Sequence, residues 1–303
     1  MLRWAVGATL AVALAGCSGA PAGVPSASSF AVPTAAEPST IQAMQACSST
    51  SERSEWAACA VPVMEDLLAA AYSPIVESRG LEFVRPTVVM GTAKTACGDL
   101  NQVAYCPQDY TLALPLDRLT TIGDNSATTV DWGDETSAYF TDKLTPEEMS
   151  TGGAYGALMA MAHEYAHHIQ TLIGYERINS DQMASEPDKA ATYSSEFELM
   201  ADCFAGWAAA VTDKNGAYDV TPKDQWAAIT ALAEIGDDFI QESRGTSKSS
   251  DSFNHGAANE RANAWVDGAG FALDGKEPYE ACLARSISLI DERTGSSASP
   301  AAS

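Results

Sequence analysis

The chain has 303 residues, and its 40 acidic against 17 basic side chains give a formal net charge of −23 at pH 7. A phosphate backbone and an anionic membrane surface both repel such a charge, so we expect no nucleic-acid partner and no electrostatic binding to lipid headgroups. The length is sufficient for one substantial domain with its own hydrophobic core.

The N-terminal residues have the features of a bacterial export signal. Arg3 precedes the apolar run WAVGATLAVALAG, which is shorter than the roughly 20 residues that a bilayer-spanning helix needs. The run leads into LAGC, which resembles the lipobox of bacterial lipoproteins, where the cysteine is lipidated and becomes the new N-terminus. We therefore predict a lipoprotein signal peptide at residues 1–16 and an extracytoplasmic protein held on the bacterial cell membrane by a lipid on Cys17. An ordinary cleaved signal is the alternative.

Composition divides the rest of the chain into three parts. Residues 17–40 are rich in Ser, Ala and Pro and have few large apolar side chains, so we predict a flexible tether. Residues 294–303 have a similar composition and are predicted to be a disordered tail. The segment between them, residues 41–293, is predicted to fold as one domain.

Six cysteines follow Cys17, and an even number in an exported protein predicts three disulfides. The sequence alone does not determine how they pair. Proximity favours Cys47–Cys59 and Cys97–Cys106, which leaves Cys203–Cys282. Zinc bound by thiolates is the rival interpretation, and the lack of a Cys-x-x-Cys pair argues against it.

The first predicted elements of the folded part include the strands. Helical spacing of apolar residues predicts a helix at 61–75, and the β-branched residues of 81–91 predict a strand. Residues 96–109 are predicted to be a loop closed by a disulfide. A second strand is predicted at 110–119, where Pro115 indicates an edge position in the sheet.

From Thr145 the sequence pattern is helical. TPEE at this point is typical of a helix start, and the next long helix, which carries HEYAH, is expected to end at Gly174. A few strands followed by many helices predict a mainly helical α+β fold. Further helices are predicted at about 188–212, 222–242, 256–272 and 277–290.

The segment HEYAH contains two histidines four residues apart. On a helix, residues i and i+4 lie on one face, so His163 and His167 can direct two imidazoles at one metal ion. Glu164 lies roughly 100° around the helix, where it can take a proton from an attacking water. The pattern of five residues is weak evidence alone, because two exposed surface histidines would give the same sequence.

Zinc in a catalytic site needs a third protein ligand, and EFELMADCFAGW offers one. Glu198 and Asp202 are four residues apart in an apolar segment, where unpaired carboxylates are costly. We predict Glu198 as the third ligand and Asp202 as the acceptor of an N–H from a ligand histidine. The alternative is a solvated acidic face that includes Glu196.

The other two histidines receive separate predictions. His255, near the start of a helix, is predicted to be catalytic by stabilising the oxyanion that forms when water attacks a carbonyl. Its alternative role is to cap that helix at the surface. His168 directly follows the second ligand and points off the metal-binding face, so packing or hydrogen bonding is expected of it.

These segments together resemble the neutral zinc metallopeptidase family of bacteria, a zincin-like group of membrane-associated proteins. The family patterns HE-x-x-HH-x-Q, EL-x-ADC-x-AG, CG…YCP and HG…R are present as HEYAHHIQ, ELMADCFAG, CGDLNQVAYCP and HGAANERANAW. The resemblance extends in one order from about Cys97 to Cys282. It implies a zincin-like domain with a small β-sheet and an active-site helix, with Glu164 as catalyst. The zinc ligands that it implies are His163, His167 and Glu198.

The sequence therefore predicts a lipid-anchored zinc endopeptidase that hydrolyses peptide bonds of a peptide or protein substrate. In zincins an extended substrate commonly lies along an edge strand, and YTLALPL is the candidate strand here. The first alternative is a lipoprotein of the same fold that binds zinc or peptides without catalysis. The second is a structural cell-envelope protein whose histidines are incidental.

Overall fold

The computed structural model describes residues 24–27, 30–33, 38–47, 52–119, 122, 138, 140–149, 154–238, 240 and 253–294. The predicted signal peptide, the lipidation site Cys17 and residues 295–303 of the predicted tail lie outside these ranges. Phe30, within the predicted tether, packs its ring 5.9 Å from that of Trp207, and Val24 is buried. Part of the predicted tether thus contacts the folded domain.

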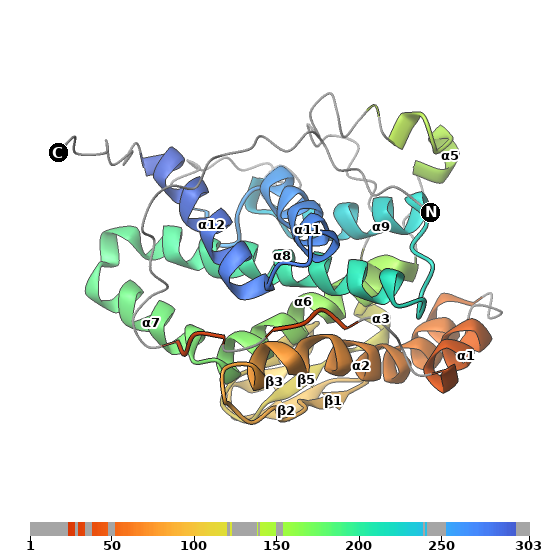
Figure 1. Ribbon diagram of the computed structural model, residues 1–303, viewed down its shortest axis with the longest axis horizontal. Coiled ribbons are helices and arrows are strands. Elements are labelled where there is room, and N and C mark those ends of the chain that lie inside the picture. The colour runs from red at the N-terminus through yellow and green to blue at the C-terminus, as the bar shows by residue number, and fades with distance from the viewer. Residues whose placement is uncertain are drawn as a thin grey trace.

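The described residues form a mainly helical α+β fold with a small sheet, as predicted (Figure 1). The strands are β1 (Thr87–Val89), β2 (Ala93–Thr95), β3 (Gly98–Leu100), β4 (Ala104–Cys106) and β5 (Thr111–Ala113). The helices are α1 (Pro38–Cys47), α2 (Arg53–Glu77), α3 (Leu116–Leu119), α5 (Pro146–Met149), α6 (Ala154–Leu172), α7 (Tyr175–Ser185), the 3₁₀ turn η1 (Pro187–Lys189), α8 (Ala190–Lys214), α9 (Pro222–Ala233), α11 (Ala258–Leu273) and α12 (Pro278–Thr294).

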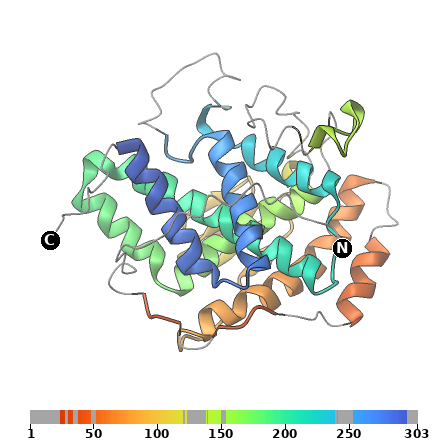
Figure 2. The ribbon, with the colours of Figure 1, turned by 45° about the horizontal axis from the view of Figure 1, so that its top comes forward.

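Helix α8 is the centre of the helical packing. It contacts α11 and α12 on one side and α6 on the other, and α6 in turn packs against α2 and α9. Figures 1 and 2 show α11 and α12 crossing α8, with α2 and the strands on the opposite side of the molecule. The interior of α8 is buried all round because it lies between two layers of structure.

The sheet corrects one prediction. Its order is β1-β5-β4, with β1 parallel and β4 antiparallel to β5. The predicted strand at 110–119 contains β5, but its predicted edge position is wrong, since β5 is paired on both sides. Its ladder ends at Ala113, so Pro115 lies beyond the strand and its missing N–H removes no ladder hydrogen bond. The edge strands of this sheet are β1 and β4, and β4 lies in a segment that the sequence predicted to be a loop.

Helix α2 is longer than predicted. It begins at Arg53, and Pro62 and Pro74 both lie inside it. Its segment Ser54–Glu77 is long and apolar enough to cross a membrane. However, 56% of the 18-residue apolar window within this segment is buried inside the structure. Tyr72 and Ile75 are fully buried, which is the pattern of a core helix.

The six cysteines form the three predicted disulfides. Cys47–Cys59 joins α1 to α2, and Cys97–Cys106 joins the β2–β3 hairpin to β4. Cys203–Cys282 joins α8 to α12 across 79 residues of sequence. The longest of these links fixes the position of the C-terminal helix on α8, and long closed loops lose the most chain entropy in the unfolded state.

Two glycines allow α8 and α11 to approach closely. A Cβ atom added to Gly268 would lie 1.8 Å from the carbonyl oxygen of Cys203. A Cβ atom added to Gly206 would lie 1.8 Å from the carbonyl oxygen of Trp265. Backbone meets backbone at both points, so no flexible side chain can move aside. These glycines set the distance between the two helices.

Gly268→Ala is expected to lower the free energy of unfolding by about 1–3 kcal/mol, because the added methyl group must separate α8 from α11. The matched control is Gly270→Ala in the same helix, where an added Cβ meets nothing within 4 Å. That control is expected to be neutral or stabilising by about 0.5–1 kcal/mol. Urea unfolding measures both. Equal stability of the two variants would contradict this description of the helix contact.

Candidate metal centre

The two histidines of HEYAH lie on α6 where that helix faces α8. His163 is 3% exposed, and the side chains of His167 and Glu164 are partly exposed. Alanines around them, including Ala162 and Ala166, are fully buried and allow neighbouring helices to pack close to α6. The helical spacing therefore places both imidazoles on one face, as predicted.

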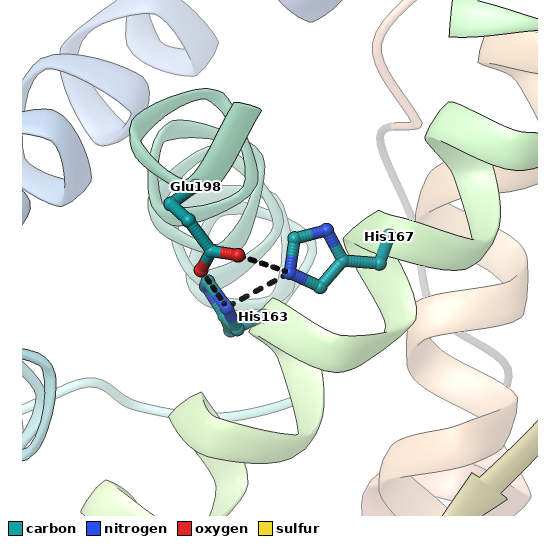
Figure 3. A group of neighbouring side chains, drawn as sticks. All are labelled: His163, His167 and Glu198. Atoms are coloured by element: carbon teal, nitrogen blue, oxygen red, sulfur yellow. Dashed lines mark hydrogen bonds and ion pairs between the residues drawn. The ribbon is translucent and has the colours of Figure 1, made fainter. Parts of the chain in front are cut away.

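Glu198, on α8, completes a group of three ligand-type side chains. One ligand atom from each of His163, His167 and Glu198 lies within 4.8 Å of the other two. The two Nε2 atoms are 3.1 Å apart, and Glu198 Oε2 lies 3.2 Å from Nε2 of His163. Glu198 Oε1 lies 3.6 Å from Nε2 of His167. Figure 3 shows these atoms converging from the two helices.

The outer nitrogens of both rings are held by oxygen atoms. Nδ1 of His163 lies 2.7 Å from Asp202 Oδ1, and Nδ1 of His167 lies 2.8 Å from Gln170 Oε1. Each oxygen accepts, so each Nδ1 carries a hydrogen and each Nε2 can present its lone pair to a metal. Two imidazoles and one carboxylate are a ligand set that zinc binds. The donor set and its orientation thus fit zinc.

Arg261, on α11, is completely buried beside this group. Its Nη2 donates to Asp202 Oδ1 at 3.0 Å, and its Nη1 donates to the carbonyl oxygen of His255 at 3.0 Å. Nη1 also lies 3.5 Å from Glu198 Oε2. One guanidinium therefore offsets the charge of a fully buried carboxylate, Asp202, and a partly buried one, Glu198, and links α8 to the loop that carries His255.

These neighbours set the pKa values of the candidate ligands in the metal-free protein. Burial alone would lower the pKa of His163, but the charge and hydrogen bond of Asp202, with the hydrogen bond of Glu198, raise it to about 10. Burial alone would raise the pKa of Glu198, yet the neighbouring imidazoles hold it well below its usual value. The extra proton of His163 lies on Nε2, toward His167 and Glu198, where a cation would be held.

The pKa of Glu164 is shifted in the direction opposite to that of Glu198. Burial raises the pKa of its carboxyl, and this effect exceeds the lowering by the charges of His163 and His167. A carboxyl with a raised pKa is a better proton acceptor than an exposed one, which suits the predicted role of a base.

His255 lies on a loop that Asp237 holds in place. Asp237 Oδ2 accepts hydrogen bonds from the backbone N–H groups of Asn254 and His255, both at 2.7 Å. The imidazole Nδ1 lies 3.3 Å from Asp237 Oδ1, and the side chain is 49% exposed. The structure thus places the backbone of His255 against Arg261 and its ring against Asp237. Its catalytic role stays a prediction.

His168 is fully buried on the other side of α6. Its Nε2 donates to the carbonyl oxygen of Val84 at 2.6 Å, and its Nδ1 accepts from the hydroxyl of Tyr105 at 3.0 Å. Burial lowers the pKa of His168, which is consistent with a neutral ring that both donates and accepts. The expected role in packing and hydrogen bonding is confirmed.

The solvated acidic face, the alternative for α8, is wrong. Asp202 is completely buried, and Glu196 is 6% exposed with one carboxyl oxygen 2.8 Å from the hydroxyl of Tyr175. Burial raises the pKa of Glu196 to about 7. Both carboxyls therefore belong to the interior, and only Asp202 reaches the histidines.

Sequence reasoning gave no role to three residues that hold the site together: Gln170, Arg261 and Asp237. Gln170 follows His167 by three residues, so helical spacing places it beside that ring, and its Nε2 donates to the carbonyl of Phe197 at 2.9 Å. Arg261 is the arginine of the quoted family pattern HG…R, which marked its position but not its role. Asp237 had no comparable signal, because its loop contacts depend on the tertiary fold.

The family model described as "Putative neutral zinc metallopeptidase" matches residues 134–273. This match contains HEYAH and ELMAD and confirms the family resemblance of the motifs. "Uncharacterized protein YpfJ" of Escherichia coli (strain K12) is 27% identical over 191 residues, which cover 61% of this chain and 58% of that protein. The chain thus spans less than two thirds of this relative.

A second relative is "Uncharacterized protein Rv2575" of Mycobacterium tuberculosis (strain ATCC 25618 / H37Rv). It is 27% identical over 228 residues, which cover 71% of this chain and 68% of that protein. No solved structure matches the chain.

Zinc binding at pH 7 is expected to release a proton. Because the pKa of His163 is raised to about 10 in the metal-free protein, that ring is protonated at pH 7 and must lose its proton to bind zinc. Apparent zinc affinity should therefore increase with pH up to about this value. Calorimetric titration in buffers of different ionisation enthalpy measures both the proton count and the stoichiometry.

We expect one zinc per chain in the wild type and in His255→Ala, whose ring lies outside the three-residue group, and none in His167→Ala. A well-folded wild-type protein that takes up no zinc would contradict the candidate site. Zinc uptake without proton release would contradict the protonated state of His163.

Proposed function

We propose that this protein is a zinc metallopeptidase that hydrolyses peptide bonds. One observation carries the proposal: His163, His167 and Glu198 direct their ligand atoms at one point, and Glu164 is adjacent on the same helix. The family match supports it, because that family is described as a metallopeptidase family.

His163, His167 and Glu198 would hold the zinc ion. Bound zinc supplies Lewis-acid polarisation of the peptide carbonyl and lowers the pKa of water to near neutrality. Asp202 and Gln170 keep the two imidazoles oriented, since each accepts a hydrogen bond from the outer ring nitrogen. Arg261 holds Asp202 in place through its 3.0 Å contact.

Glu164 would act as the base and then as the acid. Its carboxylate takes a proton from the water that attacks the peptide carbonyl, and later gives that proton to the leaving amine. Both transfers use the same side chain, so the amine leaves as a neutral group. A lipoprotein that only binds peptides has no need of a carboxylate here, so Glu164 favours catalysis over the binding alternative.

The extended substrate would pair with β4 rather than with β5. Within the described residues β4 pairs with β5 alone, and it packs beside α6. Main-chain hydrogen bonds to such an edge bind an extended peptide with little dependence on its side chains. The strand proposed to bind the substrate is therefore β4, which lies next to α6, and no longer its neighbour β5.

We also propose that the protein acts outside the cytoplasm, with a lipid on Cys17 as its membrane anchor. The support is the apolar N-terminal run that ends in LAGC and the three disulfides, which are typical of exported proteins. Its substrates would then be peptides or proteins of the cell envelope or its surroundings.

Glu164→Gln is expected to keep one zinc per chain and to reduce hydrolysis by at least about 10²-fold, because the amide cannot accept the proton from water. The substrate is a mixed-sequence library of quenched fluorescent peptides, and zinc is measured by mass spectrometry on the same samples. Exposed Glu280→Gln on α12 is the control and should retain wild-type rates. Wild-type rates in Glu164→Gln would mean that the base is assigned to the wrong residue.

Radioactive palmitate added to growing bacteria is expected to label the wild-type protein and not Cys17→Ala. The variant should also be recovered in the soluble fraction, because its attachment depends on the lipid. A wild-type protein that carries no label, or a variant that stays on the membrane, would count against the anchor.

A further inference from the structure

A hydrogen-bonded pair outside the metal site joins the edge strand to the metal-binding helix. Tyr105 lies in the middle of β4, and its hydroxyl donates to Nδ1 of His168 at 3.0 Å. His168 belongs to α6 and directly follows the candidate ligand His167. This side-chain hydrogen bond connects the strand proposed to bind substrate to the helix proposed to bind zinc.

The ring of His168 is held by a hydrogen bond at each nitrogen and by three tyrosine rings. Its Nε2 donates to the carbonyl oxygen of Val84 at 2.6 Å, which fixes the tautomer. Tyr105, Tyr110 and Tyr165 meet it edge-on, with centroids 5.5, 5.3 and 5.8 Å away. A fully buried ring with these neighbours cannot rotate freely, so it is a rigid support for Tyr105.

The C-terminal end of β4 is fixed as well. Cys106, its last residue, is bonded to Cys97, and the neighbouring Asp109 accepts a hydrogen bond from the backbone N–H of Ala96 at 2.7 Å. The ladder to β5 pairs Tyr105 with Leu112. The strand is thus attached to the β2–β3 hairpin, to β5 and, through Tyr105, to α6.

The backbone at Tyr105 faces the candidate base. Its N–H lies close enough to the Glu164 carboxyl to lower the pKa of that group. In an antiparallel pair, the N–H and C=O of one residue point the same way, so the Tyr105 carbonyl also faces away from β5. A peptide paired with this edge would meet that carbonyl next to Glu164.

We propose that Tyr105 and His168 are positioning residues that set the distance between the substrate-binding edge β4 and the metal-binding helix α6. Their functional meaning rests on the proposed peptidase activity. Their action on the strand does not, because it is a property of the contacts alone. A misplacement of substrate by about 1 Å can cost as much as 10²-fold in rate, so a fixed strand matters for catalysis.

The test compares Tyr105→Phe with Tyr110→Phe. The first removes the hydroxyl that bonds to His168 and keeps the ring. The second removes a hydroxyl from a ring that packs on the same imidazole but precedes β5. Neither change removes apolar volume, so both variants should fold. His168→Asn is the complementary variant, because it replaces the imidazole that accepts the Tyr105 hydrogen bond with a shorter side chain.

Two readouts are made on each variant. Amide hydrogen exchange at residue 105 reports the strand position without any activity, and we expect it to be at least about tenfold faster in Tyr105→Phe and unchanged in Tyr110→Phe. With the peptide of the quenched library that the wild type cleaves fastest, kcat should decrease at least about tenfold in Tyr105→Phe while KM stays within about twofold. Zinc content should equal that of the wild type.

Each result decides one claim. Unchanged exchange in Tyr105→Phe overturns the positioning inference, whether or not the wild type cleaves peptides. Faster exchange with wild-type kcat overturns it too, because the strand is then loosened without effect on catalysis. Faster exchange in a protein whose zinc-loaded wild type cleaves no library peptide supports the role in fixing the strand and rejects the proposed peptidase.

Discussion

The buried ion pair between Asp202 and Arg261 is the interaction on which the rest of the site depends. Both side chains are completely buried, and Arg261 Nη2 lies 3.0 Å from Asp202 Oδ1. Loss of one partner would leave the other charged and uncompensated, which typically costs about 3–5 kcal/mol. The same Asp202 oxygen lies 2.7 Å from His163, so the pair also determines how that ring is turned. Three helices, α6, α8 and α11, meet at this point.

The surrounding structure makes this costly arrangement possible. Gly206 and Gly268 bring α8 and α11 into backbone contact, and Cys203–Cys282 fixes α12 on the same part of α8. With α8 held on one side, Glu198 faces the two histidines of α6 on the other. The candidate metal-binding group is thus built between packed helices rather than on loops, which restricts the positions of its ligand atoms. The edge strand β4 lies beside α6, where the proposed substrate would pair with its main chain.

The sequence was most informative where chemistry depends on short spacings. The separations His163–His167 and Glu198–Asp202 are one helical turn each, so a helix alone places each pair on one face. The disulfides and the mainly helical fold were also predictable, from cysteine proximity and from hydrophobic periodicity. What failed depended on the tertiary fold: β5 became central because β4 formed from three residues in a segment full of turn formers. Arg261 contacts Glu198 and Asp202, which lie 63 and 59 residues earlier in the chain. No local sequence pattern predicts contacts over such a separation.

We propose that one zinc ion held by His163, His167 and Glu198 makes this protein a peptidase. The most direct measurement is hydrolysis of the mixed-sequence peptide library by metal-free protein as zinc is added in steps. We expect the rate to increase in proportion to added zinc and to stop increasing at one zinc per chain. A protein that binds its full zinc and hydrolyses no peptide, or one whose rate does not depend on zinc, would contradict it.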